Sequence, residues 1–210
     1  METVNFILHL IFDQLLGPLW AIFGWIMAHM TLATLCVLMG TGFSLPQIYG
    51  LLRPQAFAAA ARSFPRSVMP GRVLMLLATL WFLYNVRIES LADFADYKEY
   101  LMLLFLATGV GACFFVQDYL AVRGLALVVF LLAKLMVDTG RLHLAGNPLV
   151  LVIQGWAYVL VVAGIWFTVA PWKFRDLLAW GTATEVRIRV GCGIRLAYGI
   201  FVTTLGLAAF

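Results

Sequence analysis

The sequence predicts an all-α integral membrane protein: a polytopic bundle of about six transmembrane helices with short interfacial helices. Of its 210 residues, 64% are hydrophobic and 11% are charged, and the mean hydropathy is +0.99. Soluble domains are about half apolar and a quarter charged. A soluble fold of this length could not hide so much apolar surface, so we expect lipid to cover part of it.

Apolar runs long enough to cross a bilayer recur along the chain, separated by turn-forming or charged segments. The whole chain, 1–210, therefore reads as one transmembrane domain, with no room between spans for an extramembrane enzyme domain. We predict transmembrane helices at about residues 19–43, 73–86, 101–116, 120–139, 149–170 and 190–210.

Four shorter segments are predicted to lie at the membrane interface: 2–16, 54–66, 88–100 and 172–187. Gly17-Pro18 separates the first from the span at 19–43, and Pro54 suits the first turn of a short helix. In 88–100, apolar residues recur at helical spacing opposite an acidic face, which indicates a surface helix. The segment 172–187 is basic and contains tryptophans, as interfacial helices often do.

Two of the spans carry small residues, which let helix backbones approach closely. Gly109 and Gly111 lie in the third span. Separately, the sequence shows no repeat with a clear period. In the sixth span the small residues form a face suited to packing: Gly191, Gly193, Ala197, Gly199 and Gly206.

Basic residues predict the orientation, because basic loops stay in the cytoplasm. The net charge of +4 is therefore a signal of topology, and we expect no nucleic-acid partner. Both termini should lie outside, and the expected location is a plasma membrane, the inner membrane of a bacterium. The same loops would attract anionic lipid headgroups by about 1 kcal/mol per cation. Their cations are Arg53, Arg62, Arg66, Arg72, Arg123, Lys173, Arg175, Arg187 and Arg189.

The fourth span and its flanks carry four ionisable candidates: Asp118, Arg123, Lys134 and Asp138. Charges in a span are costly and are functional candidates by default. If the helix begins near Tyr119, both cations lie near its ends and can reach the interface. If it begins after residue 124, Lys134 falls near the bilayer middle and needs Asp138, one turn away, as a partner. The sequence leaves a structural pair and a working polar site both open.

A short run with Pro46 and Gln47 suggests a transporter. The run Ser44-Leu45-Pro46-Gln47-Ile48-Tyr49, with Arg53, resembles the proline–glutamine motif of PQ-loop transporters. The resemblance implies that Pro46 and Gln47 form a hinge for alternating access. It covers only this segment, and the second Pro-Gln pair usual in that family is absent from the sequence. The alternative interpretation is a span that ends at the proline.

Motifs for catalysis and metal binding are absent from the sequence. It has no Gly-x-Ser-x-Gly, no His-Glu-x-x-His and no glycine-rich phosphate loop. His9, His29 and His143 share no helical ligand spacing, and the three cysteines lie in separate apolar runs. We therefore expect no enzyme activity, no cofactor and no metal.

Three functional hypotheses follow. The leading one is an accessory or scaffold subunit that acts by helix packing in the membrane, with a membrane-protein partner or a second copy of itself. The alternative is a small transporter with a Lys134–Asp138 pair inside the membrane and the Pro46-Gln47 hinge. The third is a membrane enzyme acting on lipids, whose arginine-rich loops would grip headgroups.

Overall fold

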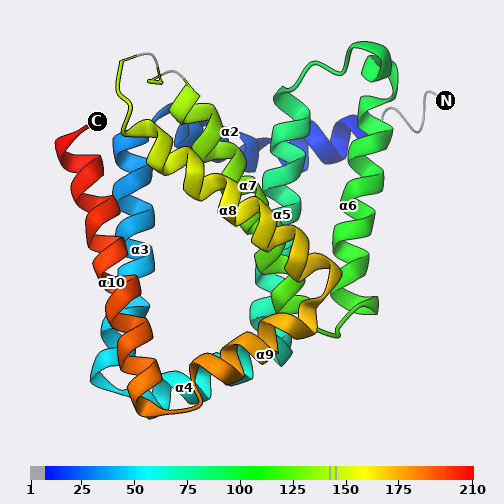
Figure 1. The fold of residues 1–210 in the computed structure, drawn as a ribbon. Coiled ribbons are helices and arrows are strands. Elements are labelled where there is room, and N and C mark those ends of the chain that lie inside the picture. Colours follow the sequence, from blue (N-terminus) through cyan, green and yellow to red (C-terminus); the bar gives the residue numbers. More distant parts are fainter. Residues whose placement is uncertain (1–7, 142, 145) are drawn as a thin grey trace.

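The computed structural model describes residues 8–141, 143–144 and 146–210, and its elements are all helices (Figure 1). Among these residues, six helices are long and apolar enough to cross a membrane, as predicted. They are α3 (Leu32–Leu52), α5 (Val68–Ile88), α6 (Lys98–Phe115), α7 (Leu120–Arg141), α8 (Val150–Val169) and α10 (Glu185–Ala208). The shorter elements are η1 (Leu10–Leu15), α2 (Gly17–Ala28), α4 (Pro54–Ser63), η2 (Phe64–Arg66), η3 (Ala92–Tyr97) and α9 (Pro171–Gly181).

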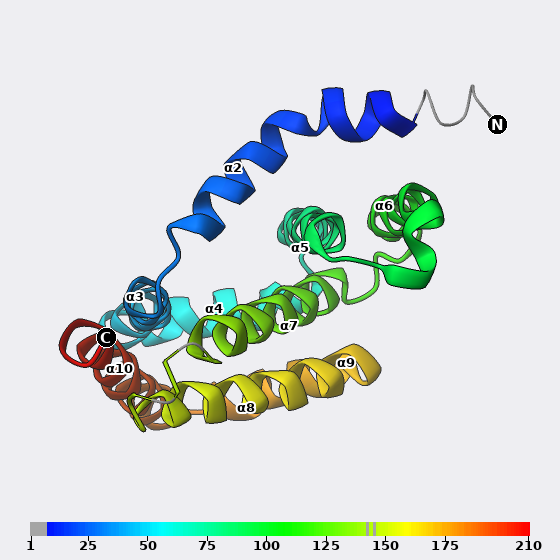
Figure 2. The same ribbon diagram turned by 90° about the horizontal axis from the view of Figure 1, so that it is seen from above.

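The long helices form two groups that stand side by side (Figures 1 and 2). One group is the antiparallel pair of α3 and α10, and in the other α7 packs against α5 and α8 while α6 packs on α5. Near the C-terminal end of α10, an apolar core joins the groups through residues such as Cys36, Met136, Ile153 and Val202. At the opposite end, α4 and α9 run between the groups (Figure 1).

Glycines allow α3 and α10 to pack with their backbones almost touching. A Cβ on Gly40 would lie 2.6 Å from the carbonyl oxygen of Gly199, and one on Gly206 would lie 2.7 Å from Cβ of Cys36. Neither position can take a larger residue without moving a backbone. Of the small-residue face predicted in the sixth span, Gly199 and Gly206 make this contact, whereas Gly193 faces open space.

The second group uses glycines in the same way. A Cβ on Gly71 of α5 would lie 2.7 Å from the amide nitrogen of Ala121 in α7. One on Gly124 of α7 would lie 2.9 Å from the amide nitrogen of Met75 in α5. Gly109 lets α6 approach Thr79 of α5, while Gly111 meets little. Both groups are therefore built around close helix pairs.

The helices α4 and α9 begin in the same way, although they are far apart in sequence. The residues before them, Arg53 (φ −134°, ψ 70°) and Ala170 (φ −129°, ψ 69°), have nearly the same backbone conformation, and Pro54 and Pro171 open the helices. Proline is well suited to the first helical turn, where its missing N–H has no intrahelical acceptor. Both helices thus turn the chain sharply after a long apolar helix, a similarity that no sequence period revealed.

The predicted first span, 19–43, is wrong as a single helix. α2 ends at Ala28 and α3 begins at Leu32. The side chain of Thr31 accepts a hydrogen bond from the amide of Thr34 at 3.2 Å, which caps the new helix. Trp20 of α2 is buried, and its Nε1 donates to the carbonyl of Phe12 at 2.7 Å.

Two further predicted helix boundaries, both near prolines, are wrong. The span was expected to end before Pro46, but α3 continues through Pro46 to Leu52. The second span was expected to begin at residue 73, but α5 begins at Val68 and holds Pro70 in its first turn, where a backbone N–H would have no intrahelical acceptor and its absence costs nothing. Proline is therefore a weaker signal of a helix end than these predictions required.

The segment 88–100 is not one amphipathic α-helix. α5 ends at Ile88, the short 3₁₀ helix η3 follows, and α6 begins at Lys98. Nζ of Lys98 donates to the carbonyls of Arg87 and Glu89, at 2.6 and 2.9 Å, and so satisfies acceptors where α5 ends. The sixth span also starts earlier than 190, because Thr184 caps α10 by accepting from the amide of Arg187.

Candidate functional site at the α3–α10 pair

An apolar cavity of about 690 Å³ lies between the two helix groups. Its wall comes from α2, α3, α5, α7, α8 and α10, and includes Trp81, Leu132, Trp156 and Tyr198. This volume falls within the range of about 300–1,000 Å³ that is usual for small-molecule sites. The space is therefore large enough for a ligand and offers it almost entirely apolar contacts.

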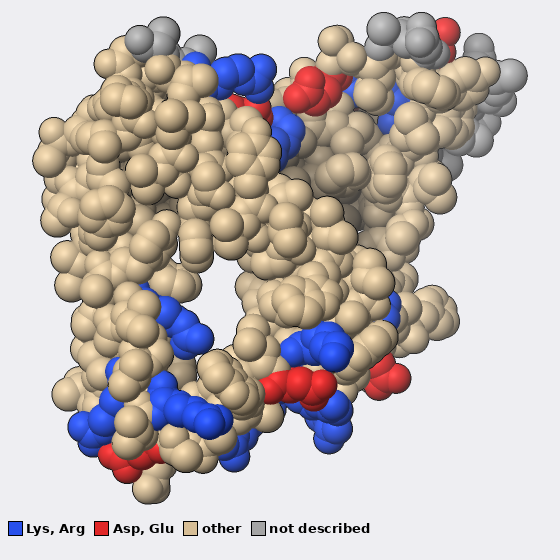
Figure 3. Space-filling view, viewed as in Figure 1, with Lys and Arg blue, Asp and Glu red and all other residues tan. Residues whose placement is uncertain are grey.

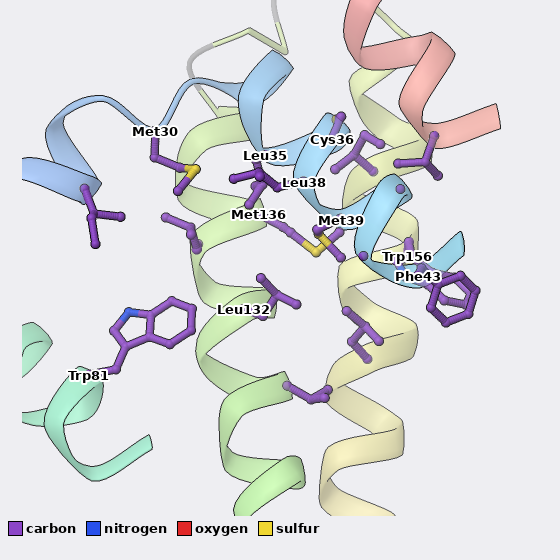
Figure 4. A pocket seen from close by; sticks show the side chains of 18 of the residues that line it. Met30, Leu35, Cys36, Leu38, Met39, Phe43, Trp81, Leu132, Met136 and Trp156 are labelled. Atoms are coloured by element: carbon purple, nitrogen blue, oxygen red, sulfur yellow. The ribbon is translucent and has the colours of Figure 1, made fainter. Parts of the chain in front are cut away.

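Methionines make part of the cavity wall adaptable. Met30, Met39 and Met136 lie around the cavity with Leu35 and Leu132, while Trp81 faces them from α5 (Figure 4). Methionine side chains are flexible and polarizable, so they can follow the shape of different apolar groups. Such a wall suits a flexible hydrocarbon better than a rigid, polar substrate.

Charge is distributed unevenly around this space. The space-filling view shows an opening through the molecule between the α3–α10 pair and the other group, with Lys and Arg gathered below it (Figure 3). Those cations belong to the connections at the α4 and α9 end, where they outnumber Asp and Glu, whereas the two signs are more evenly mixed at the opposite end. An elongated amphipathic molecule would therefore meet apolar surface at one end and positive charge at the other.

Two polar side chains are buried in the α3–α10 contact without partners. Ser44 is 8% exposed and Gln47 is 7% exposed. Within the described part of the chain, Oγ of Ser44 and Oε1 of Gln47 have no hydrogen-bond partner. A buried polar atom left unpaired costs about 1–3 kcal/mol. The contact between these helices is therefore packed closely, but it leaves two buried polar atoms without hydrogen bonds.

Arg195 of α10 lies level with Gln47 along the α3–α10 contact. Ser44 meets Gly199 and Gly50 meets Cys192 across the two helices, so Gln47 and Arg195 lie between these two contacts. Arg195 is exposed, and no hydrogen bond or ion pair joins it to any residue that the structure describes. Its Nη1 lies 4.0 Å from where a Cβ of Gly191 would be, so the side chain extends toward the α4 and α9 end of the molecule, which we call the basic end.

Sequence reasoning missed Arg195. The residue lies ten positions after Glu185 and thirteen before Ala208, well inside an apolar helix. An ionisable residue in such a place is a functional candidate by default, and that rule would have found it. The small residues around it favoured a prediction of helix packing instead.

The structure brings Lys134 and Asp138 together, but at an exposed end of the molecule. Nζ of Lys134 lies 2.7 Å from Asp138 and 3.5 Å from Glu89, and Arg141 lies 2.7 Å from Asp138. The Lys134 side chain is 42% exposed. The pair therefore belongs to a network of ion pairs that links α7 to the end of α5.

The other two predicted site residues lie far from that network. α7 begins at Leu120, before Arg123, so the earlier of the two predicted registers is the one observed. Arg123 is in the first turn, and its Nε is buried without a partner among the described atoms. Asp118 is exposed in the turn before α7. Arg123 and Lys134 are about 16 Å apart along the helix, at about 1.5 Å per residue, so the four candidates do not form one site.

Hydrogen bonds connect the elements at the basic end. Arg62 of α4 donates to the hydroxyl and carbonyl oxygens of Thr182, at 2.8 and 2.6 Å. Arg175 of α9 donates to the hydroxyl of Tyr119 at 3.0 Å. The pKa of Arg175 lies above its usual value because its guanidinium also hydrogen-bonds the carboxylate of Asp176. These contacts hold α4 and α9 in place below the opening.

Comparison with known proteins adds no assignment: no family model, no curated protein and no solved structure matches this chain. Among the described residues, no three His, Cys, Asp or Glu side chains are grouped so that they could hold a metal ion. The arrangement of the cavity, the unpaired polar groups and Arg195 is therefore the basis for proposing a function.

Proposed function

We propose that this chain is a multi-pass integral membrane protein without a catalytic role, which acts as an intramembrane scaffold by holding apolar molecules between its helices. Its basic end would face the cytoplasm, so that both ends of the chain would lie outside. The observation that carries the proposal is the apolar cavity of about 690 Å³ between the two helix groups. A cavity of this size in a bilayer would be filled by a lipid chain or by a side of a partner protein.

Native mass spectrometry of the purified protein tests this proposal. We expect lipid to remain bound after gentle removal of detergent, and a Leu38→Trp substitution to reduce the bound amount several-fold. Leu38 lines the cavity and is exposed enough to accept a larger ring without disturbing the core. Leu45→Trp is the matched control, because Leu45 is exposed on the same helix and does not line the cavity. A wild-type protein that emerges free of lipid would contradict the proposal.

A small transporter is the second candidate, and a specific observation favours it. Pro46 lies inside α3, next to Gln47, whose buried oxygen is unpaired and would gain a partner or reach water if the helix geometry changed there. A transporter must populate at least two conformations. Spin labels at the exposed positions Leu52 and Val169 should then give two distance populations in liposomes, and a single narrow population would count against this candidate.

A further inference from the structure

We propose that an anionic phospholipid occupies the space between the α3–α10 pair and the other helix group, with an acyl chain in the apolar cavity and its phosphate held by Arg195. This inference rests on the proposed function and names its ligand. It follows from three features: the direction of the polarity gradient, the free donors of Arg195 and the position of the basic end.

The polarity gradient orients the ligand. Tyr198 and Phe43 line the cavity and contact each other at its α3–α10 side, with ring centroids 6.3 Å apart. Arg195 lies one helical turn from Tyr198, on the side of the basic end. A chain that enters the cavity past Tyr198 therefore brings its head close to the guanidinium.

The guanidinium N–H donors of Arg195 have no acceptor among the described residues. The sequence of α3 contains no charged residue, and Glu185, the acidic residue of α10, already accepts from Arg189 at 2.7 Å. No carboxylate on these two helices is therefore left to neutralise Arg195. A guanidinium binds a phosphate through two parallel hydrogen bonds, and such charge-assisted bonds are stronger than neutral ones. A phosphate would give this cation the partner that the protein does not supply.

The depth of the guanidinium fits a lipid of the bilayer. It lies near Gly191, six residues after the start of α10, or roughly 9 Å along the helix at about 1.5 Å per residue. This is close enough to the basic end for a headgroup whose chains point into the membrane interior. Arg53, which is exposed at that end of the α3–α10 pair, adds positive charge near the headgroup. The ligand would thus keep the orientation of its own leaflet.

A lipid competition experiment tests the inference. The protein is reconstituted in vesicles with equal amounts of phosphatidylglycerol and phosphatidylcholine that carry identical acyl chains, and retained lipids are measured by native mass spectrometry. We expect the wild type to enrich phosphatidylglycerol, and Arg195→Gln to lower that preference about tenfold, as for the loss of one charge-assisted contact. Arg195→Lys should retain part of it.

Two matched variants separate the site from general charge. Arg66→Gln removes one positive charge from the exposed basic end and should leave the preference nearly unchanged. Gly191→Leu keeps the charge but fills the space beside the guanidinium, and should reduce the preference as Arg195→Gln does. Thermal unfolding of each variant in the same detergent checks that it is folded.

The possible results distinguish this inference from the proposed function. If the wild type retains neither lipid, the proposed function fails, and the inference fails with it. If it retains both lipids equally, or if Arg195→Gln keeps the preference, the inference is overturned while the proposed function stands. If added oleate displaces phosphatidylglycerol at an equal concentration, the ligand is a free fatty acid and the assignment to a phospholipid is wrong.

Discussion

The α5–α7 and α3–α10 contacts are both built around glycines, yet they differ in the polar side chains that lie at them. Next to the first, Lys134 is paired with Asp138 and Glu89, although Nε of Arg72 and Nε of Arg123 are buried there without a partner among the described residues. At the second, Ser44 and Gln47 hold buried atoms that have no partner within the described chain, and Arg195 stands beside them. Both contacts therefore contain buried polar atoms without partners, and they differ in that those at α3–α10 belong to uncharged side chains beside the exposed Arg195.

The largest effect is expected at Gly199. Alanine there would place a Cβ 2.9 Å from the carbonyl oxygen of Gly40 and would overlap Oγ of Ser44, whereas a Cβ on Gly193 meets nothing. Both substitutions gain about 1 kcal/mol of helix propensity, so their difference isolates the contact. We expect Gly199→Ala to lower the free energy of unfolding by about 2 kcal/mol relative to Gly193→Ala. Denaturation in mixed micelles measures this, and equal stabilities would disprove the close contact.

A smaller effect is expected at Lys134. Replacing Lys134 by Met removes its ion pairs with Asp138 and Glu89, and because these side chains are partly exposed the loss should be at most about 1 kcal/mol. The loss should shrink in high salt. Arg195→Met is the comparison, because no ion pair is lost there, and it should cost less. The contrast between the two contacts breaks down if Arg195→Met is the more destabilising of the two.

The smallest effect is expected at Gln47, where the substitution should not lower stability. Leucine would remove a buried oxygen that lacks a partner, so we expect unfolding free energy to stay the same or to rise by up to about 1 kcal/mol. Gln55→Leu, at an exposed position of α4, is the control and should change little. Thermal unfolding in detergent is sufficient, and a clear loss of stability would show that Gln47 makes a contact important to the native state.

The all-helical fold and the number of long apolar helices were predictable, because long apolar runs are a strong signal. The Lys134–Asp138 pair was predictable because residues four apart face the same side of a helix. The pairing of α3 with α10 was not, since no local pattern relates Gly40 to Gly199 across so much of the chain. The helix boundaries at Pro46 and Pro70 were wrong because proline can be held within a helix or in its first turn.

The pairing of α3 with α10 also has a consequence for how the protein is made. These helices are separated by the whole stretch from Arg53 to Thr184, so α3 is synthesised long before its partner. At about 5–20 residues per second, the interval is on the order of 10 s. During that time the polar side chains of Ser44 and Gln47 have no α10 to cover them. If the chain inserts into a membrane as proposed, lipid, the insertion machinery or an earlier helix must cover these side chains until α10 has been synthesised.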